Sequence, residues 1–377
     1  RSAAAGEVII QTQNPRHFVL QKVFESDYGG FYKNELKLRK SGHYPPFSRI
    51  ALIEVKDENE SDALGAINDY YNFISAYRKQ IDISDFYHLY PFTSHYMEIN
   101  GLKYHFLDQG TGDPVVMIHG NPTWSFYFRK LIQGLSDRYR TIAPDHMGCG
   151  LSDKPDIKQY DYRLKSRVRD LERLLEYLEI KNKITLVLHD WGGMIGMVYA
   201  VTYPQRIGRI VIMNTAAFLP PEGKSLPIRL KLVRNIASFA TLAVRGFNLF
   251  AYGALYMASY KGMKKDVKKG FIAPYNSWNN RIATLKFVQD IPVSENDPSY
   301  GLVKAVDENL FKLSHIPMLI CWGEHDFVFD VDYLDEWHRR FPDAEVHVFK
   351  DAGHYVLEDA AGRIISLVKD FLKKHPL

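Results

Sequence analysis

From about residue 95 onward, short apolar runs alternate with amphipathic segments. Between the runs lie polar stretches with apolar residues at helical spacing, such as Tyr162–Leu178. This alternation predicts an α/β protein in which helices cover both faces of a mostly parallel sheet. The runs with the length of a strand are Val115–His119, Arg140–Pro144, Ile184–His189, Ile210–Asn214, Met318–Trp322 and Glu345–Phe349.

The alternation stops between Ala216 and His315, where the pattern is mostly helical and is interrupted by prolines. We interpret this interval as a cap inserted between two strands of the sheet. The predicted parts are therefore the first part of a core over residues 91–215, a helical cap over 216–315 and the second part of the core over 316–377.

The first ninety residues do not follow this pattern and predict a small separate α+β segment, with strands at Glu7–Thr12 and Arg49–Val55 and helices at Tyr28–Ser41 and Glu60–Gln80. Within residues 1–85, the stretches GEVIIQTQNP (6–15) and GHYPPFSR (42–49) resemble part of the C-terminal region of the primosomal replication-restart helicase. The chain has no Gly-x-x-x-x-Gly-Lys phosphate loop, so the resemblance does not imply helicase activity. We expect a non-catalytic segment; a fused remnant, a docking module and a junction artefact all stay open.

The segment ITLVLHDWGGMIG (184–196) is an apolar strand that enters a Gly-rich turn and then a helix. It is typical of a nucleophile elbow, here with Asp190 at the apex where Ser is more usual. A carboxylate in this position attacks a carbon that bears a leaving group and forms an alkyl ester with the enzyme. The alternative is a strand end followed by Asp190 as an ordinary helix N-cap.

An ester intermediate needs a base that activates water, and the base needs an orienting partner. His354 in DAGHY (351–355) follows the last predicted strand, so we predict that it is the base; an ordinary surface histidine is the alternative. Asp326 in CWGEHD (321–326) follows the preceding strand and is the predicted acid, with Glu324 and Asp330 as competing candidates.

A leaving group that gains negative charge needs hydrogen-bond donors. Trp191 follows the candidate nucleophile and offers an indole N–H, while Asn121 in HGNP (119–122) offers an amide after the first core strand. We predict that both bind the leaving group. Burial of Trp191 for packing alone is the alternative.

Composition restricts the remaining possibilities. The 377 residues carry a formal net charge of +4, which gives no reason to expect nucleic-acid binding, and two cysteines do not form a disulfide framework. We expect a cytoplasmic protein, since no signal peptide is visible, and we expect no metal or organic cofactor. Asn235–Tyr260 is the longest nearly apolar stretch and predicts a pocket-lining helix pair, while peripheral association with a membrane or with pathway enzymes stays open.

Three motifs together resemble the haloalkane dehalogenase branch of the α/β-hydrolases over about residues 92–377: HGNPTWSFYFR (119–129), PDHMGCGLSDKP (144–155) and HDWGG (189–193). Within that branch the chain is most similar to the β-lactone decarboxylases of long-chain olefin biosynthesis, on MNTAAF (213–218), NRIATL (280–285) and FVQDIP (287–292). The resemblance implies an α/β-hydrolase fold with a small hydrophobic substrate. It implies Asp190 as nucleophile, His354 as base, Asp326 as acid, and Asn121 with Trp191 as leaving-group donors.

The expected activity is therefore the decarboxylation of a long-chain cis-β-lactone to a cis-alkene and carbon dioxide. A haloalkane dehalogenase would use the same residues to release halide and an alcohol. An epoxide hydrolase would also need cap tyrosines to protonate the ring oxygen, for which the sequence offers Tyr252, Tyr256, Tyr260 and Tyr275. A non-catalytic docking protein is the alternative from another class.

Overall fold

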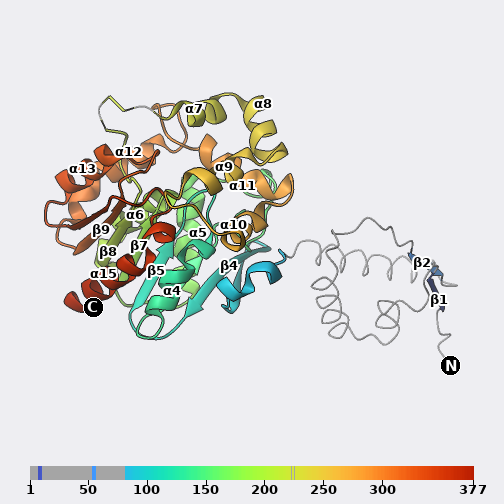
Figure 1. The fold of residues 1–377 in the computed structure, drawn as a ribbon, viewed down its shortest axis with the longest axis horizontal. Helices are drawn as coiled ribbons and strands as arrows, with labels where there is room; N and C mark the ends of the chain where they lie inside the picture. Colours follow the sequence, from blue (N-terminus) through green and yellow to red (C-terminus); the bar gives the residue numbers. More distant parts are fainter. Residues whose placement is uncertain (1–6, 11–52, 57–80, 222, 225) are drawn as a thin grey trace. The chain divides into compact units, whose positions relative to one another are not determined.

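The computed structural model describes residues 7–10, 53–56, 81–221, 223–224 and 226–377, and the chain divides into two compact units, residues 1–80 and 81–377 (Figure 1). In the first unit, β1 (Glu7–Ile10) pairs antiparallel with β2 (Ile53–Lys56). Both strands overlap the strands expected there. The helices expected at 28–41 and 60–80, and most of the helicase-like stretches, lie outside the described residues.

The second unit contains an eight-stranded sheet in the order β10-β9-β8-β7-β5-β6-β4-β3. Every pairing from β10 to β6 is parallel, as the alternation of strands and helices predicts. The six strands of this parallel part are β5 (Pro114–Ile118), β6 (Arg140–Pro144), β7 (Ile184–His189), β8 (Ile207–Met213), β9 (Met318–Gly323) and β10 (Glu345–Phe349).

An antiparallel hairpin that the sequence analysis missed forms one edge of this sheet. Strand β3 (Ser94–Ile99) turns into β4 (Leu102–Gln109) through Asn100 and Gly101, which have φ angles of 51° and 78°. An Asn-Gly pair with two positive φ angles favours a tight hairpin. That dipeptide was the sequence signal that could have located the hairpin.

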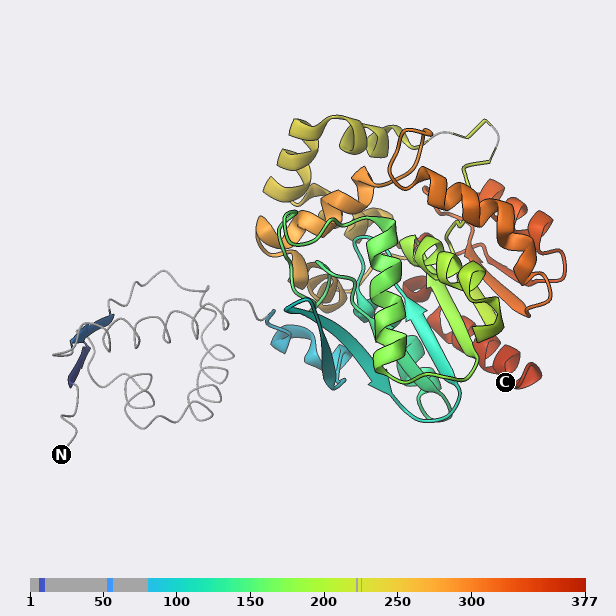
Figure 2. The ribbon, with the colours of Figure 1, turned by 180° about the vertical axis from the view of Figure 1, so that it is seen from behind.

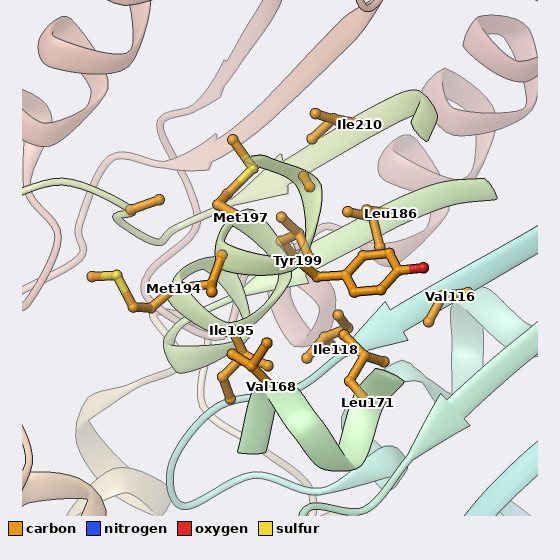
Figure 3. Packing of buried hydrophobic residues seen from close by; sticks show 14 of the residues in the cluster. Val116, Ile118, Val168, Leu171, Leu186, Met194, Ile195, Met197, Tyr199 and Ile210 are labelled. Atoms are coloured by element: carbon orange, nitrogen blue, oxygen red, sulfur yellow. The ribbon is translucent and has the colours of Figure 1, made fainter. Parts of the chain in front are cut away.

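Two hydrophobic cores cover the two faces of the sheet. Strand β5 alternates between them, because Val116 and Ile118 join one cluster whereas Val115 and Met117 join the other. Figure 3 shows the first core, where side chains of one sheet-covering helix meet those of a neighbouring helix and of three strands. The helices on this face are α5 (Leu164–Tyr177), α6 (Trp191–Thr202), α12 (Tyr300–Asn309) and α13 (Val331–Arg340); α4 (Arg129–Leu135), α14 (Val356–Asp359) and α15 (Ala361–Lys374) cover the other.

The segment between β8 and β9 is helical, as expected for a cap. Its last helix, α12, packs against α6 and so belongs to the layer that covers the sheet. Figures 1 and 2 show α7 (Ile228–Asn235) and α8 (Ala237–Ala240) as the outermost layer, above the carboxyl ends of the strands. The other described cap elements are the π-helical turn η4 (Thr241–Gly246), α9 (Leu249–Met257), α10 (Lys265–Ile272), α11 (Ile282–Gln289) and the 3-10 helices η5 (Ala273–Tyr275), η6 (Asn279–Arg281) and η7 (Leu310–Leu313).

The compact second unit starts at Ile81, whereas the sequence analysis placed the start of the core at residue 91. Residues 84–89 form a 3-10 helix in which Phe86 is buried, followed by the buried Tyr90. Phe86 packs edge-on against Phe126 at a centroid distance of 5.5 Å. Residues 81–90 therefore belong to the second unit, because Phe86 packs against the aromatic residues that follow β5.

None of the helices within the described residues has the length and apolar character needed to cross a lipid bilayer.

Candidate active site

Asp190 lies at a strained turn between the end of β7 and the start of α6. Its φ and ψ angles are 51° and −128°, a backbone conformation that L-residues with a side chain rarely adopt. The turn is closed by the hydrogen bond from the Gly193 N–H to the Asp190 carbonyl at 3.0 Å. At Gly192 a Cβ atom would lie 1.8 Å from the Ile118 carbonyl oxygen, so only glycine fits there. The predicted elbow geometry is present, with a carboxylate at its apex.

Two loops at the same edge of the sheet bring His354 and Asp326 to this carboxylate. His354 follows β10 and Asp326 follows β9, as the sequence analysis placed them. His354 Nε2 lies 3.5 Å from Asp190 Oδ2, and its Nδ1 lies 2.7 Å from Asp326 Oδ2. All three side chains are buried. The structure therefore brings these three predicted residues into one linear arrangement.

Asp326 is held by contacts that the competing carboxylates lack. Its Oδ1 accepts backbone N–H bonds from Val328 at 2.7 Å and Phe329 at 3.1 Å, and its Oδ2 accepts from Asn214 Nδ2 at 3.0 Å. Glu324 is exposed. Asp330 instead caps α13 and forms an ion pair with the Lys224 ammonium group.

Asn214 supports the site through side-chain contacts that the sequence analysis did not predict. Its side chain accepts the Gly323 N–H at 2.8 Å and donates to the Gly323 carbonyl at 3.0 Å, in addition to its bond to Asp326. These bonds tie the end of β8 to the end of β9. Only the pairing of the two strands brings position 214 to position 326, so the local pattern carried no signal for this contact.

His189 contacts the backbone of His354. Its Nε2 donates to the His354 carbonyl oxygen at 2.9 Å, and its ring stacks on Tyr127 at a centroid distance of 4.2 Å. Burial lowers the pKa of His189 to about 3. This residue is therefore a neutral structural neighbour.

The charges of the three residues depend on one another. Burial raises the pKa of Asp190, but the hydrogen bond from His354 and the charge of that imidazole outweigh burial and hold the pKa below its ordinary value. Burial lowers the pKa of His354, whereas the charge of Asp326 and the bonds to both carboxylates raise it to about 10. At neutral pH the pair consists of a carboxylate and an imidazolium.

Asn121 reaches the candidate nucleophile through its backbone. Its N–H donates to Asp190 Oδ1 at 2.7 Å, while its side-chain amide donates to the Thr284 carbonyl in α11 at 3.1 Å. The indole N–H of Trp191 makes no hydrogen bond with any residue that the structure describes, and its ring packs against Phe287 at 5.3 Å. Trp191 therefore offers a donor without a partner among the described residues, and Asn121 uses one of its two side-chain N–H groups to hold the cap.

A cavity of about 450 Å³ opens above Asp190. Its floor contains Asn121, Asp190, Trp191 and His354, and most of its wall comes from apolar cap residues. The predicted pocket-lining stretch 235–260 does contribute to the wall. The cap side chains of this stretch that line the cavity are Phe239, Ala243, Val244, Leu249, Phe250, Ala254, Met257 and Ala258.

The four cap tyrosines that an epoxide hydrolase would need do not line this cavity. Tyr252, Tyr256 and Tyr260 are exposed, and Tyr275 is buried with its hydroxyl donating to the Thr123 carbonyl. In this respect the site does not match the expectation for epoxide opening.

A mostly parallel sheet with a buried carboxylate at its elbow, a histidine and a second carboxylate on the neighbouring loops, and a helical cap defines an α/β-hydrolase with aspartate at the nucleophile position. The family model described as alpha/beta hydrolase fold matches residues 113–361. The chain belongs to this family.

Two similar proteins carry the name cis-3-alkyl-4-alkyloxetan-2-one decarboxylase. The protein from Shewanella oneidensis is 52% identical over 285 residues, which are 75% of this chain and 89% of the relative. The protein from Xanthomonas campestris is 43% identical and covers 76% of this chain and 98% of the relative.

The chain is also similar to haloalkane dehalogenases. One from Mycolicibacterium paratuberculosis is 31% identical over 74% of this chain and 93% of the relative. The crystal structure of the haloalkane dehalogenase DatA from Agrobacterium tumefaciens matches 75% of this chain and 97% of its own, with a TM-score of 0.68 and 22% identity. The last comparison speaks for the fold alone.

Proposed function

We propose that this protein converts a cis-3,4-dialkyl oxetan-2-one, a β-lactone, into a cis-alkene and carbon dioxide, with Asp190 as nucleophile. The observation that carries the proposal is the position of the Asp190 carboxylate, which lies at the floor of an apolar cavity and is paired with His354. The names and coverage of the two decarboxylase relatives support the substrate class.

The chemistry follows from a carboxylate nucleophile and a strained ring. A carboxylate oxygen of Asp190 attacks ring carbon C4, and the C4–O bond breaks so that the ring oxygen leaves as part of a carboxylate on C3. The C3–carboxylate bond then breaks, its electron pair forms the C3=C4 double bond, and Asp190 leaves from C4. Inversion at C4 followed by anti loss of both groups keeps the two alkyl chains on the same side, which gives the cis-alkene.

The other site residues stabilise charge in this route. The Trp191 indole N–H and the His354 imidazolium can donate to the carboxylate that forms on C3, and the Asn121 backbone N–H holds the second oxygen of Asp190. Asp326 keeps His354 oriented. Water is not consumed, so the apolar cap favours elimination over hydrolysis by limiting the access of water to the ester.

The experiment is gas chromatography with mass detection after purified protein has been given a cis-disubstituted long-chain β-lactone. We expect alkene and carbon dioxide in equal amounts, and a loss of about a thousand-fold or more in Asp190→Asn. Asp330→Asn is the matched control, because it removes a carboxylate near the site that does not contact His354, and it should stay within about two-fold of wild type.

Haloalkane dehalogenation is the second candidate, because the unpaired Trp191 indole N–H is suited to a halide. A parallel assay with a 1-bromoalkane distinguishes the two. Halide and alcohol without any alkene from the lactone would replace the decarboxylase assignment with a dehalogenase. Full lactone turnover by Asp190→Asn would exclude both reactions, and the absence of any Asp190-dependent reaction would favour the non-catalytic docking protein.

We also propose a cytoplasmic location. Cys149 and Cys321 are buried free thiols, which fits a reducing compartment. Fractionation of cells that produce the protein tests this, and recovery from an oxidising compartment would contradict it.

A further inference from the structure

The outer side of the cap exposes large apolar side chains close together in sequence. We call Leu232, Ile236, Phe239, Leu242, Phe247 and Leu249 the cap patch; their exposed fractions range from 40% at Leu232 to 63% at Phe247. Phe239 and Leu242 are three residues apart in the continuous helical stretch of α8 and η4, so they share one helical face. A group of exposed apolar residues of this size marks a surface that contacts another apolar phase or a partner.

The cap patch continues into the cavity. Leu232, Phe239 and Leu249 are each exposed and also line the cavity above Asp190. α7 and α8 form the outermost layer of this unit (Figures 1 and 2). An apolar molecule that crosses the patch therefore reaches the candidate nucleophile along a surface that is apolar for most of its length.

The charge of the cap differs from that of the rest of the chain. The cap, residues 216–315, contains fourteen Lys and Arg and seven Asp and Glu, whereas the rest of the chain contains 34 basic and 37 acidic residues from the totals of 48 and 44. Beside the patch, Lys231 and Arg245 have no ion pair with a carboxylate in the described part of the chain, and Arg245 lies over the Trp278 ring at 4.6 Å. Two basic side chains without a carboxylate partner in the described residues thus stand next to the apolar residues of the patch in the sequence.

We infer that the cap patch docks on an anionic lipid bilayer, with its apolar side chains at the level of the headgroups and its lysines and arginines on the lipid phosphates. Helices that lie in a membrane interface combine apolar and aromatic residues with Lys and Arg in this way. The core of a protein–protein interface is instead depleted in lysine. The inference deepens the proposed function, on which it rests for the substrate, because a lactone with two alkyl chains partitions into a bilayer.

Co-sedimentation of the full chain with vesicles tests the inference without any substrate. We expect binding to vesicles of phosphatidylcholine with phosphatidylglycerol, and much weaker binding to phosphatidylcholine alone. Lys231→Gln with Arg245→Gln should weaken binding to the anionic vesicles by about thirty-fold, at about fivefold for each charge removed. Leu242→Asp with Phe247→Asp should remove binding, and neither residue lines the cavity.

Tyr177→Asp with Phe311→Asp is the matched control. These residues are 59% and 67% exposed. Tyr177 ends α5, which leads into the amino end of β7, and Phe311 lies in the 3-10 helix Leu310–Leu313, which leads into the amino end of β9. Both therefore lie at the edge of the sheet opposite the cap. We expect this control to bind like wild type, and all three double variants to turn over a short, water-soluble β-lactone at the wild-type rate.

Equal loss of binding in the control, or no preference for anionic vesicles, would overturn the inference. The inference would also be overturned if wild type did not bind vesicles and instead formed a dimer, or a complex with another protein, that Leu242→Asp with Phe247→Asp dissociates. Vesicle binding without any lactone turnover would refute the proposed function and leave the docking surface standing, so the two failures are distinguishable.

Discussion

Replacing Asp190 by Asn should change the charge of His354 as well as remove the proposed nucleophile. His354 lies between two carboxylates, with Nε2 at 3.5 Å from Asp190 Oδ2 and Nδ1 at 2.7 Å from Asp326 Oδ2. The substitution keeps the shape of residue 190 and removes its negative charge, as formation of an ester at Asp190 would. It therefore imitates the electrostatic state of the covalent intermediate.

The size of the effect follows from the distance. Coulomb's law with an effective dielectric constant of about 20 gives about 5 kcal/mol for unit charges 3.5 Å apart, which corresponds to a pKa change of about 3.5. The pKa of His354, raised to about 10 in the wild-type protein, should fall to about 6.5 in Asp190→Asn. A histidine that stays protonated in the resting enzyme would then become able to accept a proton once the nucleophile is esterified.

Nitrogen-15 NMR of the imidazole groups measures this change directly. The full chain, labelled on histidine, is titrated from about pH 5 to about pH 11, and the signal of His354 among the 14 histidines is assigned by its loss in His354→Gln. Asp330→Asn is the control that removes a charge without touching His354. A midpoint in Asp190→Asn within about half a pH unit of wild type would refute the electrostatic reasoning.

Three further outcomes follow from the same geometry. The contribution of His354 to stability should fall by about 1.4 kcal/mol per pH unit between about pH 6.5 and about pH 10, because folded His354 keeps its proton after the unfolded chain has lost it. Urea unfolding of wild type against His354→Gln isolates this contribution, and equal pH profiles of the two proteins contradict it. His354→Phe should accumulate an alkyl ester on Asp190 when treated with a 1-bromoalkane, seen as added mass on the intact protein; an unchanged mass counts against Asp190 as nucleophile. Gly192→Ala should lower the free energy of unfolding by about 3 kcal/mol or more, because its Cβ would meet the Ile118 carbonyl oxygen. Gly362→Ala is the control and should not destabilise the protein, because nothing lies within 4 Å of its added Cβ. Equal denaturation midpoints of the two variants would show that the elbow tolerates a side chain.

Strands such as β7 and β9 were predictable because buried parallel strands are continuous apolar runs. The observed bounds of β6, β7 and β10 equal the predicted ones, although β10 is only partly buried. The elbow was predictable because the strained turn at Asp190 needs small residues after it, and Gly192 and Gly193 stand there in the sequence. His354 and Asp326 could be placed because the carboxyl ends of parallel strands share one edge of the sheet.

Other features depended on contacts between distant residues. Asp326, and neither Glu324 nor Asp330, contacts His354. The Asn214 side chain that helps to hold Asp326 reaches it only because β8 and β9 pair. The hydrogen bond from Asn121 to Thr284 joins residues that are 163 positions apart, and it forms because the cap packs on the core. Residues 81–90 join the second unit because the buried Phe86 packs on aromatic rings far along the chain.

The sequence by itself determined which residue types stand at the ends of the strands, and with them the carboxylate at the apex of the elbow, because periodicity and turn requirements act over a few neighbouring residues. The tertiary structure alone decided which donors remain free and which way the cap side chains point. Trp191 keeps its indole N–H unpaired among the described residues, and the cap tyrosines lie away from the cavity, because packing of the whole cap, and no local pattern, selects those orientations.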